Sequence, residues 1–568
     1  MIRNLIELTK NKVYSRTESS AKSGAGYWNV ITLLIALLVS IPILTVAVNI
    51  FIPSGDIWQH LVSTVLSDYI KNSIWLILGV GSGVLILGVG TAWLVTMCKF
   101  PGSRWFNWLL ILPMAVPAYL MAYTYTDFLA YTGPLQTLIR DITGWGLGDY
   151  WFPNVRSVQG AIIMMSFVFF PYVYLLTRAA FLEQSSSLLE ASRSLGATSF
   201  ESFYKIALPL ARPSIAAGAA LALMETLNDF GTVDYFGVQT FTTGIYRTWF
   251  GLGERAAAAQ LSGFLLIFIL VLILLERWSR NKMNTKQSST GRYKTLHIYE
   301  LHGWKAWLST LFCSLPVIVG FLIPVAILTE MMITNFDAAV DSRFIQFSIN
   351  TIIVAVLAGF LALFVALIMA YGVRLNPNVF TKSFTRIGAM GYAIPGSVIA
   401  VGILIPFGWF DNVIDSWFRD NLGFSTGLIL SGTIIALIFA YVVRFLAVAF
   451  NTVEASLGKI TSNMDEAAEG MGFGFGKILR KVHIPMMSGS LFAAIMLVVV
   501  DVIKELPATL IVRPFNFDTL AVQVYRLASD ERLAESSGAA LAIILVGLIP
   551  VIILSKSIAK TRKSNLKE

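Results

Sequence analysis

A run of roughly 20 apolar residues can cross the hydrocarbon core of a bilayer as a helix, and this sequence contains twelve such runs. They lie near residues 28–50, 72–98, 108–130, 158–182, 210–235, 257–277, 307–334, 349–373, 388–408, 427–450, 488–512 and 536–558. Only 13% of the 568 residues are charged, whereas a typical soluble domain has about 25%. Strands of a membrane barrel would instead alternate apolar and polar residues over about ten positions. We therefore predict an all-α, polytopic membrane protein with about twelve transmembrane helices.

A polar stretch of 20 residues occurs twice between these runs. Glu190 to Pro209 reads EASRSLGATSFESFYKIALP, and Glu466 to Pro485, which aligns with it at an offset of 276, reads EAAEGMGFGFGKILRKVHIP. The repeat extends to further pairs, which are Asn72 and Asn350, Pro117 and Pro395, Glu225 and Asp501, and Asp229 and Glu505. Because an even number of spans separates equivalent points, both copies have the same orientation. We predict two parallel six-helix repeats, related by an axis along the membrane normal.

The polar segments set the predicted boundaries of these repeats. They are a cytoplasmic N-terminal tail (1–27), a first repeat (28–277), a cytoplasmic linker (278–306), a second repeat (307–558) and a cytoplasmic tail (559–568). This orientation places most Lys and Arg residues inside, as the positive-inside rule requires. The net charge of +9 is then expected to face anionic membrane lipid and not nucleic acid. Cys98 and Cys313, the only cysteines, are interpreted as free thiols.

The repeated stretch has the features of a short helix–turn–helix. Thr198 to Glu201 has the spacing of a capping box, and Gly196 suits a left-handed helix stop. Pro209 is expected near the first turn of span five, where a missing N–H costs little. The second copy keeps Gly472 and Pro485. Such a loop is either an ordinary helical connection or a docking element, and its duplication favours docking.

The pattern of Glu-Ala, a glycine six residues after the Glu and a proline 19 residues after it is similar to the EAA loop of permease subunits of binding-protein-dependent ABC importers. The first copy departs mildly, because Ser192 follows Glu-Ala. The resemblance implies a type I importer permease with fused tandem halves. It also implies the ATPase-coupling positions Glu190, Ala191, Gly196, Pro209, Glu466, Ala467, Gly472 and Pro485.

The same resemblance implies partners and a location. Two copies of a cytoplasmic ABC ATPase would dock on the loops, and a periplasmic or lipid-anchored substrate-binding protein would deliver substrate. The chain would be a multi-pass protein of the bacterial inner membrane, with both termini in the cytoplasm. No GxxxxGK[ST] motif occurs in the sequence, so ATP and Mg²⁺ are assigned to the partner. We predict a transporter subunit without a cofactor of its own, and not an enzyme.

Spans five and eleven carry charged residues, which are costly inside a membrane and mark a pathway or an ion pair. The candidate substrate-pathway residues are Glu225, Asp229, Asp501, Lys504 and Glu505. Four carboxylates around a pore suit a hard cation. The alternative is that they cap broken helices, or pair with Lys504 and Arg513. Gly231 and Pro507 follow the carboxylates at equivalent positions and predict a helix break in each half. No metal-ligand set is identified.

The segment Lys504 to Leu533, KELPATLIVRPFNFDTLAVQVYRLASDERL, resembles ferric iron importer permeases, which implies ferric iron as the substrate. Related permeases for thiamine, phosphonate or another small anion are the alternative. An ion-driven secondary transporter is a further hypothesis from another class, but it leaves the duplicated loops unexplained.

Overall fold

The computed structural model describes residues 27–52, 55–146, 148–183, 194, 196, 198–281, 299–376 and 378–565. Within these residues, 11 helices are long and apolar enough to cross a membrane. A twelfth candidate is a helix pair, Ser103–Ala115 and Ala118–Thr143, which is bent by 88°. The prediction of an all-α protein with about twelve spans is confirmed, with the third span sharply bent.

The first span is Tyr27–Asn49. The helices of the first repeat that follow it are α2 (Gly55–Thr64), α3 (Leu66–Met97), α4 (Ser103–Leu109), α5 (Ala118–Leu129), α6 (Pro134–Thr143), α7 (Val158–Glu183), α9 (Ser199–Ser202), α10 (Leu208–Asn228), α11 (Gly231–Tyr235), α12 (Phe241–Tyr246) and α13 (Arg255–Asn281). Two short strands, β1 (Cys98–Lys99) and β2 (Tyr299–Glu300), pair in parallel. They join the end of α3 to the end of the predicted linker.

The second repeat follows the same order. Its helices are α14 (Trp304–Val317), α15 (Ile323–Thr334), α16 (Phe336–Ala339), α17 (Ser342–Leu375), α18 (Val379–Gly388), α19 (Gly396–Leu422), α20 (Ile434–Leu457), α21 (Ser462–Gly470), α22 (Phe475–Ile478), α23 (Ile484–Ile503), α24 (Pro507–Val512), α25 (Leu520–Ser529) and α26 (Leu533–Asn565). Equivalent hydrogen bonds support the repeat: Asn72 Nδ2 donates to the carbonyl of Gln239, and Asn350 Nδ2 donates to that of Asp518.

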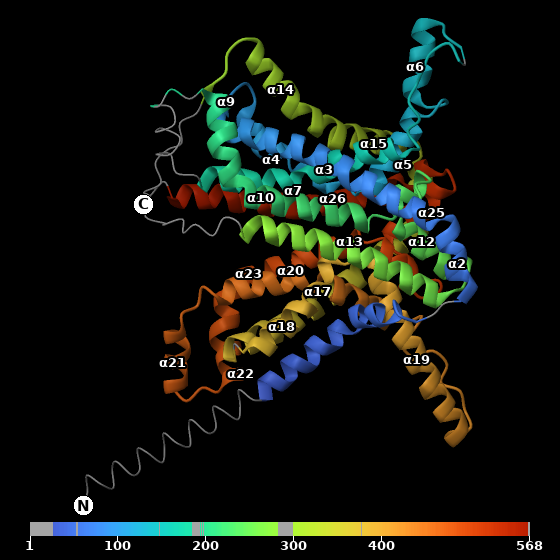
Figure 1. The fold of residues 1–568 in the computed structure, drawn as a ribbon, viewed down its shortest axis with the longest axis vertical. Helices are drawn as coiled ribbons and strands as arrows, with labels where there is room; N and C mark the ends of the chain where they lie inside the picture. Colours follow the sequence, from blue (N-terminus) through green and yellow to red (C-terminus); the bar gives the residue numbers. More distant parts are fainter. Residues whose placement is uncertain are drawn as a thin grey trace, which may run out of the picture.

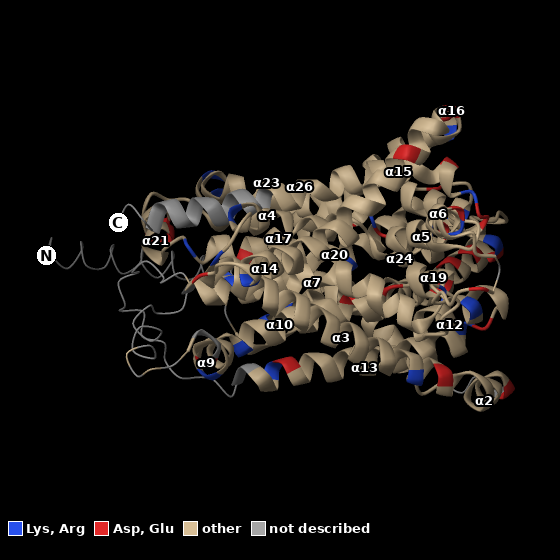
Figure 2. Cartoon of the chain, turned by 90° about the horizontal axis from the view of Figure 1, so that it is seen from above, with Lys and Arg blue, Asp and Glu red and all other residues tan. Residues whose placement is uncertain are grey.

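The long helices run side by side between two ends of the molecule, as Figure 1 shows. One end, here called the loop end, carries α9 and α21. The opposite end, the arm end, carries α6, α12 and the C-terminal part of α19. Charged residues gather at the two ends, while tan, uncharged residues cover the region between them (Figure 2). This distribution is the one expected for a bundle that crosses a bilayer.

Glycines in α3 allow this helix to pack closely against α7. A Cβ on Gly79 would lie 2.5 Å from Cδ1 of Ile162, and a Cβ on Gly88 would lie 2.6 Å from Cβ of Val173. Both partners are in α7. The glycines of span two, among them Gly79, Gly81 and Gly83, therefore form a helix-packing surface of the kind that membrane helices commonly use. Cys98 and Cys313 are buried and free, as expected.

Spans one and seven each pack on the other half of the chain. A Cβ on Gly372 would lie 2.9 Å from Cβ of Thr32, so span one contacts α17. Tyr125 in α5 donates a hydrogen bond of 2.7 Å to the carbonyl of Val319, between α14 and α15. A Cβ on Gly320 would lie 3.0 Å from the carbonyl oxygen of Phe167. The two repeats are thus interlocked, although the sequence divides them at the linker.

Candidate functional site

The second copy of the repeated stretch forms a helix–turn–helix at the loop end. Helix α21 is followed by Gly472, whose φ of +79° is in the left-handed region that glycine favours. The N–H of Gly472 donates to the carbonyl of Glu469, and the N–H of Phe473 donates to that of Ala468. This pair of backbone hydrogen bonds closes the end of the helix. Helix α22 then begins after Gly474.

One side of α21 is open to solvent. Glu466 and Ala467 are exposed, whereas the neighbouring Ala468 is buried. Met464 and Met471 are 44% and 67% exposed. Flexible methionine side chains on an exposed face are typical of surfaces that bind other proteins. The predicted coupling positions of this copy therefore lie on an accessible face with an apolar margin.

The other side of α21 is anchored by Asp465. Its Oδ2 accepts a 2.8 Å hydrogen bond from Arg374 at the end of α17, and its Oδ1 lies 2.6 Å from Nε2 of the buried His483. Arg374 also donates to the carbonyls of Leu457 and Ile460. The loop is therefore fastened to helix α17 and to the turn that leads into α23.

The first copy shares the left-handed glycine of this turn and adds a capping box where it is described. Glu190 and Ala191 lie outside the described residues. Gly196 has a φ of +85°, as its predicted role as a helix stop requires. The N–H of Thr198 donates to Glu201 and the N–H of Glu201 donates to Oγ1 of Thr198, which completes the predicted capping box. These bonds, with Lys205, hold the pKa of Glu201 below its usual value.

Each loop continues into its span through a π-helical turn. These turns are Phe203–Ala207 and Leu479–His483, and each ends two residues before the proline, Pro209 or Pro485. Pro209 lies in the first turn of α10, as expected, and the π-turn before it is part of the same continuous span, Phe203–Asn228. The wider turn accommodates a proline that has no N–H to donate. A displacement of either loop is therefore passed directly to a long helix.

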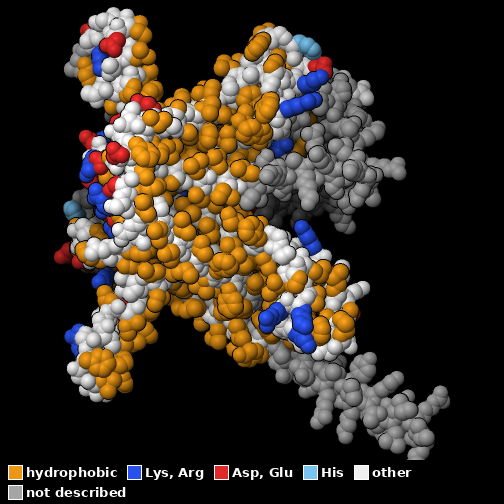
Figure 3. Space-filling model, turned by 180° about the vertical axis from the view of Figure 1, so that it is seen from behind, with side chains coloured by type: hydrophobic (Ala, Val, Ile, Leu, Met, Phe, Trp, Pro, Cys, Tyr) orange, Lys and Arg blue, Asp and Glu red, His pale blue; other side chains and the backbone are white. Residues whose placement is uncertain are grey.

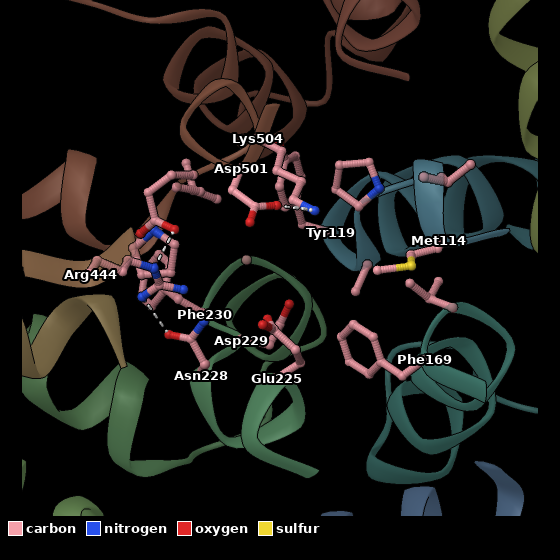
Figure 4. A pocket seen from close by; sticks show the side chains of 18 of the residues that line it. Met114, Tyr119, Phe169, Glu225, Asn228, Asp229, Phe230, Arg444, Asp501 and Lys504 are labelled. Carbon is pink, nitrogen blue, oxygen red and sulfur yellow. Dashed lines mark hydrogen bonds and ion pairs between the residues drawn. The ribbon is translucent and has the colours of Figure 1, made fainter. Parts of the chain in front are cut away.

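The five predicted pathway residues line one cavity of about 100 Å³. Glu225 and Asp229 come from the first repeat, and Asp501, Lys504 and Glu505 come from the second. Figure 4 shows Glu225 and Asp229 on one side of the cavity, with Asp501 and Lys504 across it. Aromatic side chains complete the wall, among them Tyr119, Phe169, Tyr172 and Tyr392. The two halves thus meet at these charges, as the repeat predicted.

Two of the cavity carboxylates, those of Asp501 and Glu505, form ion pairs. Lys504 Nζ lies 2.9 Å from Oδ1 of Asp501. Nε of Arg444, in α20, lies 3.0 Å from Oε2 of Glu505, and each of these two side chains is 5% exposed. Nη1 of Arg444 also donates to Oδ1 of Asn228, which joins the halves (Figure 4). The cavity wall thus holds four carboxyl groups and two basic side chains.

Asp229 and Glu505 also cap the helices that follow the two breaks. Helix α10 ends at Asn228 and α23 at Ile503, so both spans are interrupted near the predicted Gly231 and Pro507. Oδ1 of Asp229 accepts from the N–H of Thr232, and Oε1 of Glu505 accepts from that of Ala508, each at 2.9 Å. These bonds satisfy N–H groups that a helix start leaves open.

This geometry favours the capping and pairing alternative for three of the four carboxylates. Asp501, Asp229 and Glu505 have the partners described above. Arg513 pairs with Asp518 and not with the carboxylates of the cavity. Among the described residues, no group of three His, Cys, Asp or Glu side chains is placed to hold a metal ion. The fourth carboxylate, that of Glu225, forms no ion pair or hydrogen bond with the described residues.

Arg444 and Asn228 are cavity residues that the sequence reasoning missed. Arg444 interrupts an otherwise apolar stretch of span ten, IIALIFAYVVRFLAVAF. A single arginine inside a transmembrane run is costly and marks a functional pair, so this signal was present in the sequence. Asn228 is the equivalent of Lys504 at the offset of 276, and nothing local predicts that it binds Arg444.

Comparison with known proteins identifies relatives along most of the chain. Residues 84–285 match the family of binding-protein-dependent transport system inner membrane components. The chain is 26% identical over 494 residues to an Fe(3+)-transport system permease protein of Haemophilus influenzae, covering 86% of this chain and 90% of that one. It is 22% identical over 490 residues to a ferric transport system permease protein of Actinobacillus pleuropneumoniae, covering 82% and 68%.

A shorter relative aligns with one part of the chain. A molybdenum transport system permease protein of Escherichia coli strain K12 is 26% identical over 200 residues, which are 34% of this chain and 84% of the relative. Most of that protein therefore corresponds to about a third of this sequence. This relation fits a chain that holds two permease repeats in tandem.

Proposed function

We propose that this chain, a permease subunit of the binding-protein-dependent ABC importers, carries ferric iron across the inner membrane of a bacterium. The substrate assignment rests on the similarity to an Fe(3+)-transport permease over 86% of the chain, which includes both repeats. The excess of carboxylates in the cavity supports a cation of hard, oxygen-preferring character. The molybdenum relative aligns with 34% of the chain and supports the family more than a substrate.

The transport cycle that we propose is alternating access driven by a partner. Two ATPase subunits, which hold ATP and Mg²⁺, bind the two loops in the cytoplasm. Their closure moves Glu466 and Ala467 together with Asp465, which is fastened to Arg374 and His483. The continuous helix Phe475–Ile503 then carries this movement to Asp501 in the cavity wall. In the first repeat Phe203–Asn228 connects its loop with Glu225.

In this proposal Glu225 makes the first contact with the cation in the cavity. Among the described residues its carboxylate forms no ion pair, so binding there breaks none of the pairs around the cavity. The cation then competes with Lys504 for Asp501, which lies across the cavity. An external binding protein delivers the substrate, and both chain termini lie in the cytoplasm.

The test is ATP hydrolysis by the complete transporter. The chain is reconstituted in lipid nanodiscs with its ATPase and its binding protein, and hydrolysis is measured with ferric iron, thiamine, phosphonate or molybdate. We expect stimulation by ferric iron. Stimulation by another substrate and none by ferric iron would refute the substrate and leave the family intact. Transport that needs no ATPase would instead support an ion-driven transporter.

A further inference from the structure

Two helical arms project from the arm end of the molecule. One contains α6 and its return loop, residues 131–152, and the other contains the C-terminal part of α19 with its return loop, residues 409–431. Helix α6 occupies residues 134–143, and adding 278, the separation of the equivalent Pro117 and Pro395, gives 412–421, inside α19. The arms are therefore equivalent parts of the two repeats. They extend in opposite directions (Figure 1).

Helix α6 has one apolar stripe whose outer residues are exposed and whose inner residues, Leu135 and Ile139, are half-buried. Leu135, Leu138, Ile139 and Ile142 recur at the spacing of one helix face. Leu138 is 55% exposed and Ile142 is 75% exposed. Trp151, in the return loop, is 84% exposed.

The polar side of α6 is closed by its own return loop. The hydroxyl of Tyr150 donates to Oε1 of Gln136 at 2.7 Å, and Nε2 of Gln136 donates to the carbonyl of Leu129 at 2.8 Å. Arg140 donates to the carbonyl of Tyr131. These bonds hold the arm in one shape and leave the apolar stripe facing outward.

The arm of α19 is built in the same way. Its outward face includes Val413, 46% exposed, and Trp417, 55% exposed. On the polar side, Asp411 accepts from the N–H groups of Leu430 and Ser431, at 2.9 and 2.7 Å. Asp415 accepts from the N–H of Thr426 in the same return loop, at 2.8 Å. The apolar face of this arm is also exposed.

From this arrangement we infer that both arms lie flat in the headgroup–acyl boundary of the membrane leaflet at the arm end. In Figure 3 the hydrophobic side chains of the two arms continue the apolar band of the spans, while charged side chains lie on their far side. An amphipathic helix with Trp and Leu on one face and charges on the other binds a membrane in this way. A single receptor on the pseudo-two-fold axis would not cover two arms that point apart.

The arms would give the permease two lateral anchors beyond its spans. Each anchor sits beside a helix of the cavity: α5 supplies Tyr119 to the wall, and α19 packs against α24. They would oppose tilting of the two halves when the loops are pulled together. The inference requires insertion in a membrane, and it does not depend on which substrate is carried.

Spin labels on the two faces of each arm test this placement. Leu138→Cys and Val413→Cys place a label on the apolar faces. Asp141→Cys and Asn412→Cys place a label on the polar faces and serve as the controls. Asp420 is not used because it borders the apolar face. Both control positions are exposed. The chain without an added cysteine measures labelling of the buried Cys98 and Cys313.

The measurement is relaxation of each label by oxygen and by a water-soluble nickel chelate, in nanodiscs of phosphatidylcholine. We expect an oxygen-to-nickel ratio several-fold higher at positions 138 and 413 than at positions 141 and 412. Equal ratios on the two faces would overturn the inference. A second result would also overturn it: nickel reaches the labels on the apolar faces freely, and adding the external binding protein then protects them. That result would mean that the apolar faces bind the binding protein and not the membrane. Gel filtration confirms that each variant is folded.

Discussion

Arg444 and Glu505 form an ion pair in which each side chain is only 5% exposed. Two such charges are expensive to bury, and their pairing offsets that cost only while both are present. Arg444 reaches Asn228 of the other repeat, and Glu505 caps α24. One pair therefore holds the halves together and fixes the broken helix beside the cavity.

Replacing Arg444 by Met should destabilise the protein by about 3–5 kcal/mol, because Glu505 stays buried without its partner. Thermal unfolding in detergent measures the loss. Arg343→Met is the matched control, since its pair with Asp341 is at the surface and should be worth less than about 1 kcal/mol. The second change Glu505→Gln should recover part of the loss in the Arg444→Met background. Equal effects of the two Arg variants would contradict this account.

Glu225 and Asp229 should respond differently to neutral substitution. Glu225→Gln removes a carboxylate that has no partner among the described residues, so transport should fall several-fold with little change in stability. Asp229→Asn weakens the hydrogen bonds to Thr232 and Val233 and should also cost about 1 kcal/mol of stability, as helix-cap variants do. Transport assays and thermal unfolding of the same samples separate the two effects. Full transport by Glu225→Gln would remove it from the pathway.

The second loop depends on a turn and an anchor at opposite ends of α21. The turn needs Gly472 in a left-handed conformation, and the anchor joins Asp465 to α17 and to the π-turn before α23. Such a connection makes the loop and the span move as one body. The two features can be tested separately.

Gly472→Ala should weaken the turn by roughly 1–2 kcal/mol, because a side chain is unfavourable at a φ of +79°. The affinity of the ATPase for the permease, measured by titration in nanodiscs, should decrease. Gly476→Ala is the control, because Gly476 lies in α22 with no positive φ and with open space around its Cβ position. If both variants bind equally well, the shape of the turn has no part in docking.

Asp465→Asn should uncouple ATP hydrolysis from transport. Arg374 and His483 would lose their shared carboxylate, so α21 would move without carrying α23. We expect several-fold more ATP hydrolysed for each ion transported, measured in proteoliposomes. Asn463→Ala, at an exposed position of the same helix, should leave this ratio unchanged. An unchanged ratio in Asp465→Asn would show that the anchor is dispensable.

The exchange of spans one and seven makes the two repeats one folding unit. Span one packs on α17 and span seven packs on the first repeat. Neither repeat can bury these surfaces alone. The contacts of spans one and seven therefore hold the two halves together more than the covalent connection through the linker does.

Two separate chains, cut at residue 290 in the linker, should still assemble. Co-expression with an affinity tag on one half and purification in detergent measure this directly. Each half expressed alone should aggregate or be degraded, because surfaces that span one or span seven covers would be exposed. Gly320→Leu should reduce co-purification, since a Cβ there already meets Phe167 and Pro113 within about 3 Å. A first half that purifies alone as a stable protein would contradict this view.

Local patterns in the sequence were sufficient for much of this architecture. Apolar length predicts the spans, the offset of 276 predicts the repeat, and Gly231 and Pro507 predict the breaks. The conformations of Gly196 and Gly472 follow from helix-end signals. The repeat is found by comparing the two halves, whereas each of the other features depends on residues within one turn or one span.

Only the tertiary structure decided which distant groups pair. The sequence presented four equivalent carboxylates, but packing gave Asp501, Asp229 and Glu505 different partners and left Glu225 open. Hydropathy also treats lipid and protein as the same apolar surroundings. It therefore could not show that span one crosses to the other repeat, or that α6 and the tip of α19 keep one face uncovered. Those outcomes depend on which surfaces fit each other in three dimensions.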